Sequence, residues 1–208
     1  MEPTLLKATM EPFEHFLLSD FYDAEFADRL SRWLSGDAPW ARAVHHFYDQ
    51  FELNFRHVPS IPDDLTSSLL STAALDRVRR LAEGLFATRL LPHVCVCAHK
   101  LVDGQGIGIH TDDCPGEESH RILVQLSRGW RDGFGGNLLF FGSDDVSDIK
   151  AMFRHVFNTA IAFSLGGVSY HAVSDVSGGE RLTVIYGFWS ASSAFDASRH
   201  AGRTFTIE

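Results

Sequence analysis

From about residue 90 onward the chain alternates short β-forming runs with turns that are rich in glycine and aspartate. The turns read DGQGIG, RGWRDGFGG, SLGG and SGGE. The runs between and beside them are His93–Val102, Arg121–Ser127, Asn137–Gly142, Val156–Phe163, Val168–Val176, Arg181–Trp189 and Arg203–Ile207. Many short strands joined by such turns are typical of a sandwich, a barrel or a jelly roll, and not of alternating βαβ units. We therefore predict a mainly β fold.

The first part of the chain predicts helices that flank this β core. Apolar residues recur at helical spacing in two stretches, around residues 26–34 and 74–85. The elements expected here are a helix capped by Ser19 or Asp20, strands at Val44–Leu53 and Asn54–Val58, and a helical stretch after Pro62 with Ser71 as an internal cap or kink. No repeat or linker divides the chain. We expect one domain over residues 1–208, with a helical part at about 1–90 and the β core at about 91–208.

The charge balance argues against nucleic acid as a partner. The 208 residues include 18 Lys and Arg against 27 Asp and Glu, a net charge of −9, whereas nucleic-acid-binding proteins usually carry a basic footprint. No stretch approaches the roughly 18 consecutive apolar residues of a membrane span. The N-terminal residues include acids where a secretory signal would be basic, and the three cysteines are few and odd in number. These features predict a soluble, cytoplasmic protein with reduced thiols and no membrane partner.

The clearest candidate for chemistry is the tripeptide His110-Thr111-Asp112, which follows a strand-like run at residues 107–109. Side chains two residues apart on a strand point to the same side, so the imidazole and the carboxylate can converge on one point. A third ligand from elsewhere would complete the set of two histidines and one carboxylate that leaves positions open on iron(II) in oxygenases. Taken alone, a His-x-Asp tripeptide is more often a surface turn.

A hairpin predicted around residues 168–189 adds three polar groups to the β core. Its first strand carries His171, and after the SGGE turn its second strand carries Arg181 and Thr183. A histidine within a strand is usually a core residue, and an arginine at a strand start is usually a rim charge. However, a long apolar run follows Arg181, and a buried guanidinium needs a carboxylate, which it can bind with two hydrogen bonds. The hairpin core offers no evident acidic partner, so a bound dicarboxylate would fill this place.

In their order and spacing these motifs resemble the iron(II)/2-oxoglutarate-dependent oxygenases, and most closely their prolyl-4-hydroxylase-like branch. The similarity extends from about His99 to Trp189. It includes RILVQLSRGWRDGFGGNLLFF, which resembles that branch's strand, tryptophan loop and Gly-Gly-x-Leu strand, and FNTAIAFSLGGVSYHAV, which resembles the strand before the distal histidine. The resemblance implies a double-stranded β-helix, a relative of the jelly-roll and cupin folds, in an enzyme that uses iron(II), 2-oxoglutarate and O₂.

The resemblance also implies roles for single residues. The catalytic iron ligands would be His110, Asp112 and His171. Arg181 would bind the distal carboxylate of 2-oxoglutarate, with support from Thr183. Where the family often has tyrosines, the matching positions hold Gln125 and Lys100. Gln125 is expected to face inward, whereas Lys100 would either make a second charge contact or be an exposed strand residue.

A zinc site is a competing interpretation for four alternate residues of one run: His93, Cys95, Cys97 and His99. All four could face one side of a strand. Four successive alternate residues span about 20 Å, too far to converge on one ion, and structural zinc favours pairs of ligands from two segments. We therefore expect these residues to pack in the core or to support the site.

The implied reaction is hydroxylation of an unactivated carbon, with 2-oxoglutarate converted to succinate and CO₂. Asp112 favours hydroxylation over halogenation, because halogenating relatives leave the carboxylate position to a halide. We expect the substrate to be a side chain within a peptide or protein, such as a ribosomally made bacterial peptide. The alternative substrate is a free amino acid or small metabolite. The alternative of another class is a non-catalytic jelly-roll module that binds a metal or acts as a sensor. No feature indicates an oligomeric state.

Overall fold

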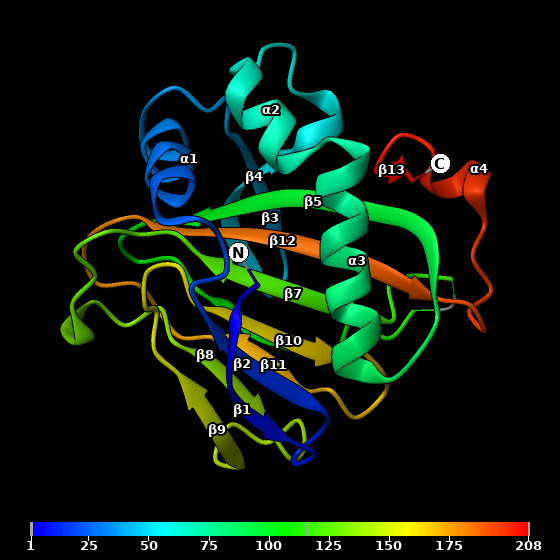
Figure 1. The fold of residues 1–208 in the computed structure, drawn as a ribbon. Helices are drawn as coiled ribbons and strands as arrows, with labels where there is room; N and C mark the ends of the chain where they lie inside the picture. Colours follow the sequence, from blue (N-terminus) through cyan, green and yellow to red (C-terminus); the bar gives the residue numbers. More distant parts are fainter. Residues whose placement is uncertain (1, 115, 208) are drawn as a thin grey trace.

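A strongly curved antiparallel sheet dominates the computed structural model, which describes residues 2–114 and 116–207 (Figure 1). The described residues form thirteen strands: β1 (Thr4–Thr9), β2 (His15–Ser19), β3 (Ala41–His45), β4 (Tyr48–Asn54), β5 (Leu90–Leu101), β6 (Ile107–His110), β7 (His120–Gln125), β8 (Leu138–Phe141), β9 (Ile149–Phe153), β10 (Ala160–Ser164), β11 (His171–Val173), β12 (Arg181–Ser190) and β13 (Thr204–Thr206). Their order is β1-β2-β10-β7-β12-β5-β4-β6-β11-β8-β9, with β13 on β5 and β3 on β4. The predicted mainly β, jelly-roll-like fold is confirmed.

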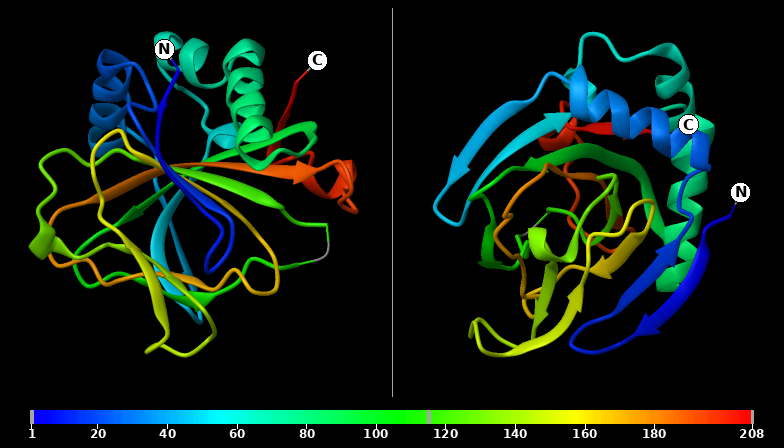
Figure 2. Two further views of the ribbon diagram at one scale, coloured as in Figure 1. Left: turned by 60° about the horizontal axis from the view of Figure 1, so that its bottom comes forward. Right: turned by 90° about the vertical axis from the view of Figure 1, so that its left-hand side faces the viewer.

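Helices cover the convex side of this sheet and leave its concave side for the site. The helical elements are α1 (Ala24–Gly36), α2 (Asp63–Leu69), α3 (Thr72–Phe86), α4 (Ala197–His200) and the short 3₁₀ turns η1 (Phe55–His57) and η2 (Asp132–Phe134). Helices α1 to α3 lie together against the outer face, whereas α4 lies near the C-terminus (Figures 1 and 2). Within the described residues, no helix is long and apolar enough to cross a membrane.

The central strand β12 shows how the sheet separates its two faces. Nine of its ten residues are buried because both faces are covered. One set of alternate residues packs in the core beneath the helices: Leu182, Val184, Tyr186 and Phe188. The other set begins with Arg181, Thr183 and Ile185, and these side chains line a pocket inside the curve. The sheet therefore places polar groups on one face of a strand whose other face packs in the hydrophobic core.

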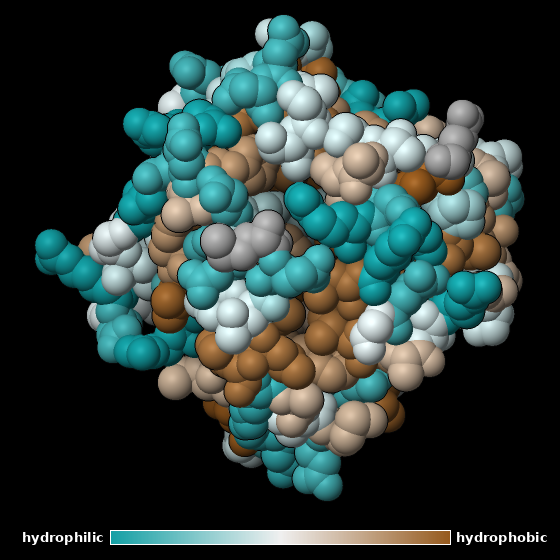
Figure 3. Space-filling model, viewed as in Figure 1, coloured by the Kyte–Doolittle hydropathy of each residue, from teal (hydrophilic) through white to brown (hydrophobic). Residues whose placement is uncertain are grey.

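The N-terminal part contains more strand than the sequence predicts. β1 and β2 pair with each other, and β2 joins the main sheet through β10. β1 is an edge strand whose Leu5 and Leu6 are 51% and 55% exposed, and apolar side chains gather at the surface in this region (Figure 3). Helix α1 is capped by Asp23, whose side chain accepts hydrogen bonds from two backbone N–H groups, and not by Ser19 or Asp20. The predicted cap was wrong because β2 occupies the chain up to Ser19.

The two strands predicted between the helices also need correction. The chain turns at residues 46–47, so β3 and β4 form an antiparallel hairpin in place of one strand over Val44–Leu53. The stretch Asn54–Val58 contains the turn η1 and not a strand. Ser71 accepts a hydrogen bond from the backbone of Ala74 and starts α3 as a separate helix. β4 then pairs with both β5 and β6, which completes one wall of the interior.

Candidate active site

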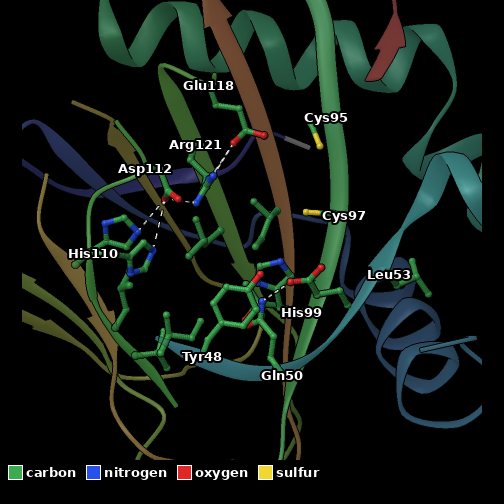
Figure 4. Close-up of a pocket in the computed structure, with 18 of the residues that line it drawn as sticks. Tyr48, Gln50, Leu53, Cys95, Cys97, His99, His110, Asp112, Glu118 and Arg121 are labelled. Carbon is green, nitrogen blue, oxygen red and sulfur yellow. Dashed lines mark hydrogen bonds and ion pairs between the residues drawn. The ribbon is translucent and has the colours of Figure 1, made fainter. Parts of the chain in front are cut away.

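Three side chains converge inside the curved sheet where β6 lies beside β11. His110 ends β6, His171 begins β11, and the two residues are opposite each other in the antiparallel pairing. The Nε2 atoms of His171 and His110 lie 3.2 Å and 3.7 Å from Oδ2 of Asp112 (Figure 4). All three ligand atoms lie within 4.8 Å of one another, and no other group of histidine, cysteine or acidic side chains in the described residues has this geometry. The predicted triad is therefore brought together, and it can hold a metal ion.

Backbone carbonyls fix the orientation of both imidazole rings. Nδ1 of His110 lies 2.9 Å from the carbonyl oxygen of Gly108, and Nδ1 of His171 lies 2.8 Å from that of Ser169. A carbonyl oxygen only accepts, so each Nδ1 carries a proton, and Nε2 is the ring nitrogen that faces the other side chains of the triad. This is the arrangement found in metal-binding histidines, in which the second ring nitrogen is held by a backbone or carboxylate oxygen. A donor set of two imidazoles and one carboxylate suits iron(II).

Arg121 on β7 holds the carboxylate of the triad in place. Its Nη1 donates to Oδ2 of Asp112 at 2.6 Å, while its Nε and Nη2 donate to Oε2 of Glu118 at 3.0 Å and 2.8 Å. Burial opposes ionisation of Asp112, but Arg121 and the two histidines outweigh it and hold the pKa of Asp112 well below its usual range. Burial, reinforced by His171, lowers the pKa of His110 to about 4. The sequence analysis missed Arg121 and Glu118, although a charged residue in the apolar run RILVQL was a signal.

Arg181 is a buried cation without an acidic partner. It is 2% exposed, its Nε donates to the carbonyl of Gly136 at 2.7 Å, and its Nη1 donates to Oγ1 of Thr183 at 2.8 Å. Its Nη2 has no hydrogen-bond partner among the described residues. Burial lowers the pKa of Arg181 to about 10, with no nearby carboxylate to oppose the effect. The side chain nevertheless remains a cation at neutral pH.

Gln125 adds a second buried hydrogen-bond donor beside Arg181 and Thr183. It lies opposite Thr183 in the pairing of β7 with β12, is fully buried, and accepts a hydrogen bond from the Thr183 hydroxyl at 3.4 Å through Oε1. Its Nε2 has no partner in the described part of the chain. Two buried donors, Arg181 Nη2 and Gln125 Nε2, are therefore left unsatisfied, which is costly unless a ligand accepts from them. A carboxylate has the required acceptors.

The structure contradicts a contact from Lys100 in this pocket. Side chains alternate along β5, and it is His99 that lines the pocket. Lys100 faces the other side of the strand, where its Nζ lies 3.5 Å from Oε1 of Glu180 and over the rings of Trp40 and Phe51. The prediction that Lys100 makes a second charge contact was wrong, because the alternation of side chains along β5 places the preceding residue, His99, on the pocket side.

Cys95 and Cys97 line the pocket beside His99, as the prediction of packing or support at the site expects. They belong to no metal-holding group among residues 2–114 and 116–207. Hydrogen bonds from Cys95 and His99 lower the pKa of the Cys97 thiol to about 6. This environment favours the thiolate form of Cys97.

One pocket of about 300 Å³ contains the triad, Arg181 and Thr183 (Figure 4). This volume lies at the lower end of the range of about 300–1,000 Å³ that is typical of ligand pockets. Its remaining polar wall comes from β4: Tyr48, Gln50, Glu52 and Asn54. The sequence analysis placed a strand here but assigned no function to it.

Comparison with known proteins decides the family. Residues 96–189 match the model of the 2OG-Fe(II) oxygenase superfamily. This β core belongs to the 2OG-Fe(II) oxygenase superfamily. A domain of this superfamily implies an enzyme that uses Fe(II), 2-oxoglutarate and O₂, and the group of His110, Asp112 and His171 fits the iron site. No curated protein matches the chain.

Solved structures with the same fold include several prolyl hydroxylases. A prolyl-4-hydroxylase from Pseudomonas putida is 19% identical, with a TM-score of 0.67 over 84% of this oxygenase and 91% of that chain. A Trichoplax adhaerens prolyl hydroxylase, solved with a peptide fragment of hypoxia inducible factor, is 11% identical. The two structures match with a TM-score of 0.68 over 84% of this chain and 83% of that chain. A viral collagen prolyl hydroxylase from Paramecium Bursaria Chlorella virus-1, solved with 2-oxoglutarate, is 16% identical. The two structures match with a TM-score of 0.59 over 84% of this chain and 94% of that chain. The oxygenase thus shares its fold with the prolyl-4-hydroxylase-like branch.

Proposed function

We propose that the enzyme hydroxylates an unactivated carbon in a side chain of a peptide or protein. The observation that carries this proposal is the presence, in one pocket, of a preformed triad and a buried guanidinium without an acidic partner. A metal-binding barrel of another kind needs the first feature but not the second. The peptide held by the Trichoplax structure and the prolyl hydroxylase fold support a peptide or protein as the substrate.

Each residue of the site has a role in this proposal. The iron ligands are the Nε2 atoms and the carboxylate of three residues: His110, Asp112 and His171. Arg181 binds the distal carboxylate of 2-oxoglutarate, and Thr183 holds the guanidinium in the orientation for this contact. Gln125 contributes its free amide N–H to the same carboxylate. Arg121 keeps Asp112 ionised and fixes its orientation.

When bound, Fe(II) with 2-oxoglutarate and O₂ supplies the oxidation, in which one oxygen atom becomes the substrate hydroxyl and the other enters succinate as CO₂ leaves. The protein's own contribution is to orient the reactants and to exclude water. The apolar residues Ile107, Leu123 and Ile185 line the pocket and restrict solvent there. We also propose that the enzyme acts in the cytoplasm.

The test is an assay of the purified enzyme with Fe(II), 2-oxoglutarate, O₂ and peptides that vary in their central residue. We expect succinate to form in step with a peptide product heavier by one oxygen atom, located on a side chain by fragmentation in the mass spectrometer. The His171→Ala variant serves as the control and should form neither product. Oxidation of free amino acids alone, with all peptides untouched, would contradict the peptide substrate.

A further inference from the structure

The pocket holds a second set of polar groups that the proposed reaction does not use. They alternate along β4 and share one wall: Tyr48, Gln50, Glu52 and Asn54. Tyr48 pairs with Ile107 of β6, the strand that ends at His110, and Glu52 pairs with His99 of β5. The row therefore runs from the strand of the iron triad to the opposite wall of the pocket. Figure 4 shows Tyr48 and Gln50 within this space.

Gln50 presents a buried acceptor without a partner. The residue is 2% exposed, and its Nε2 donates to Oε1 of Glu52 at 2.8 Å. This bond fixes the amide orientation, because the carboxylate can only accept. Oε1 of Gln50 is consequently left with no hydrogen bond within the described residues. A buried acceptor in this state is costly unless a ligand donates to it.

Glu52 is a carboxylate without a cation. It accepts a hydrogen bond from Nε2 of Gln50 at 2.8 Å. Burial and the neighbouring Glu52 raise the pKa of Tyr48 to about 12, so the phenol stays a donor at neutral pH. None of the ion pairs in the described part of the chain involves Glu52. An incoming cation would therefore compensate this carboxylate.

The cations of the pocket are engaged elsewhere. Arg121 pairs with both Asp112 and Glu118 through its three nitrogens. Arg203, at the pocket margin, lies 3.6 Å from Oε2 of Glu117. Arg181, the remaining guanidinium of the pocket, forms a separate group with Thr183 and Gln125. No arginine of the pocket is therefore paired with the β4 wall.

We propose that Glu52 and Gln50 recognise a cationic substrate side chain that is rich in N–H donors, such as that of lysine or arginine. Glu52 balances its charge, and Oε1 of Gln50 accepts one of its hydrogen bonds. The aliphatic stem of such a side chain consists of unactivated methylene groups, which are the carbons that this class of enzyme oxidises. This inference rests on the proposed function and adds the chemistry of its substrate.

Other substrate chemistries fit the wall less well. An anionic side chain would be repelled by Glu52 and by Asp112. A prolyl or other apolar side chain would displace water from Glu52 and leave Oε1 of Gln50 unpaired. Sites built to hydrogen-bond a substrate discriminate strongly against analogues that lack the matching group, because their own polar atoms are then left without partners.

The test compares matched ligands that differ in charge. The probes are the Nα-acetyl amides of lysine and arginine against those of norleucine and citrulline, which are their neutral counterparts. Calorimetric titration is carried out without oxygen on enzyme loaded with Fe(II) and 2-oxoglutarate. We expect each cationic probe to bind at least tenfold more tightly than its neutral counterpart. Glu52→Gln should reduce this ratio below threefold, whereas Glu25→Gln, which removes the same charge from the exposed face of α1, should leave it unchanged.

A second variant guards against a folding defect in the first. Gln50→Leu removes the unpaired acceptor at similar volume and should weaken both cationic probes several-fold, while the affinity for 2-oxoglutarate stays within twofold of the wild type. Equal binding of charged and neutral probes by the wild type would overturn the proposal. A charge preference that survives Glu52→Gln would do the same.

The binding test separates this inference from the proposed function. Titration without oxygen needs no turnover, so selective binding of the cationic probes supports the inference even if the enzyme hydroxylates no peptide. The absence of peptide hydroxylation would count against the proposed function alone. Conversely, hydroxylation of norleucyl or prolyl peptides in preference to lysyl and arginyl peptides would contradict the inference and leave the proposed function intact.

Discussion

Two regions, one in the pocket and the layer directly behind Thr183 and one on the β4 wall, leave opposite kinds of polar atoms unpaired. Around Arg181 the unpaired atoms are buried donors, Arg181 Nη2 and Gln125 Nε2. Along β4 they are acceptors, Gln50 Oε1 and the uncompensated carboxylate of Glu52. The donor region suits the carboxylate of a co-substrate, and the acceptor region suits a cationic substrate. The difference shows how hydrogen-bond polarity can keep two ligands in separate parts of a pocket of about 300 Å³.

The strongest effect should come from the iron triad, which serves both regions. Loss of one ligand atom in His171→Ala should weaken Fe(II) binding by about 100-fold or more, since even residues that only support metal ligands contribute about 10- to 100-fold. The measurement is a competition titration of Fe(II) under argon. His46→Ala, which removes an exposed histidine from the turn between β3 and β4, is the matched control. Unchanged affinity in His171→Ala would remove this residue from the metal site.

The next largest effect separates the donor region from the metal. Arg181→Ala should raise the dissociation constant for 2-oxoglutarate by roughly 30- to 100-fold, because hydrogen bonds to charged groups contribute about 1.5–3 kcal/mol each. The affinity for Fe(II) should stay within about twofold, since Arg181 contacts none of the three ligands. Calorimetric titrations with 2-oxoglutarate and with the metal give the two values. An equal loss of metal affinity would contradict the assignment of Arg181.

An intermediate effect concerns Cys97, which lies beside Asn54 in the pairing of β4 with β5. Its pKa of about 6 lies below the value of about 8.5 of an ordinary thiol, so the thiolate forms as pH rises through 6. Alkylation by iodoacetamide should therefore follow a midpoint near pH 6 and change little above pH 7.5. The rate is measured by mass spectrometry in Cys114→Ser, which removes the exposed cysteine. A midpoint above pH 8 would contradict the described environment of Cys97.

The smallest effect is expected at Lys100. Because its ammonium contacts Glu180 and two aromatic rings on the far side of β5, Lys100→Met should change the dissociation constant for 2-oxoglutarate by less than about twofold. The same calorimetric titration used for Arg181→Ala provides this value. A tenfold loss would place Lys100 back among the groups that bind the co-substrate.

The features that the sequence predicts well are those carried by local spacing. His110 and Asp112 are two residues apart, and Arg181 and Thr183 follow a short turn after the strand of His171, so neighbouring residues determine which side chains share a face. Lys100 was placed on the wrong face of β5, because the local spacing does not show which of two successive residues faces the pocket. A shift of one residue along β5 exchanges the two faces of the strand, and nothing local distinguishes His99 from Lys100.

The features that the sequence does not predict depend on contacts between distant segments. In isolation, Gln50 and Glu52 look like residues of a solvated strand, and they become interior only because β4 pairs with β5 and β6. The link from Arg121 to Asp112 likewise requires β7 to lie next to the loop after β6. β1 was missed because nearly all of its residues are exposed, which removes the alternation that identifies a half-buried strand.

The most direct test of the account is an anaerobic titration of the metal-free protein with Fe(II) and 2-oxoglutarate, followed by visible spectroscopy. The account predicts a weak charge-transfer band that requires both components. The band should need much more 2-oxoglutarate in Arg181→Ala and should be absent in His171→Ala. Fe(II) binding without this band at saturating 2-oxoglutarate would contradict the co-substrate site, and failure of the wild type to bind Fe(II) would contradict the triad itself.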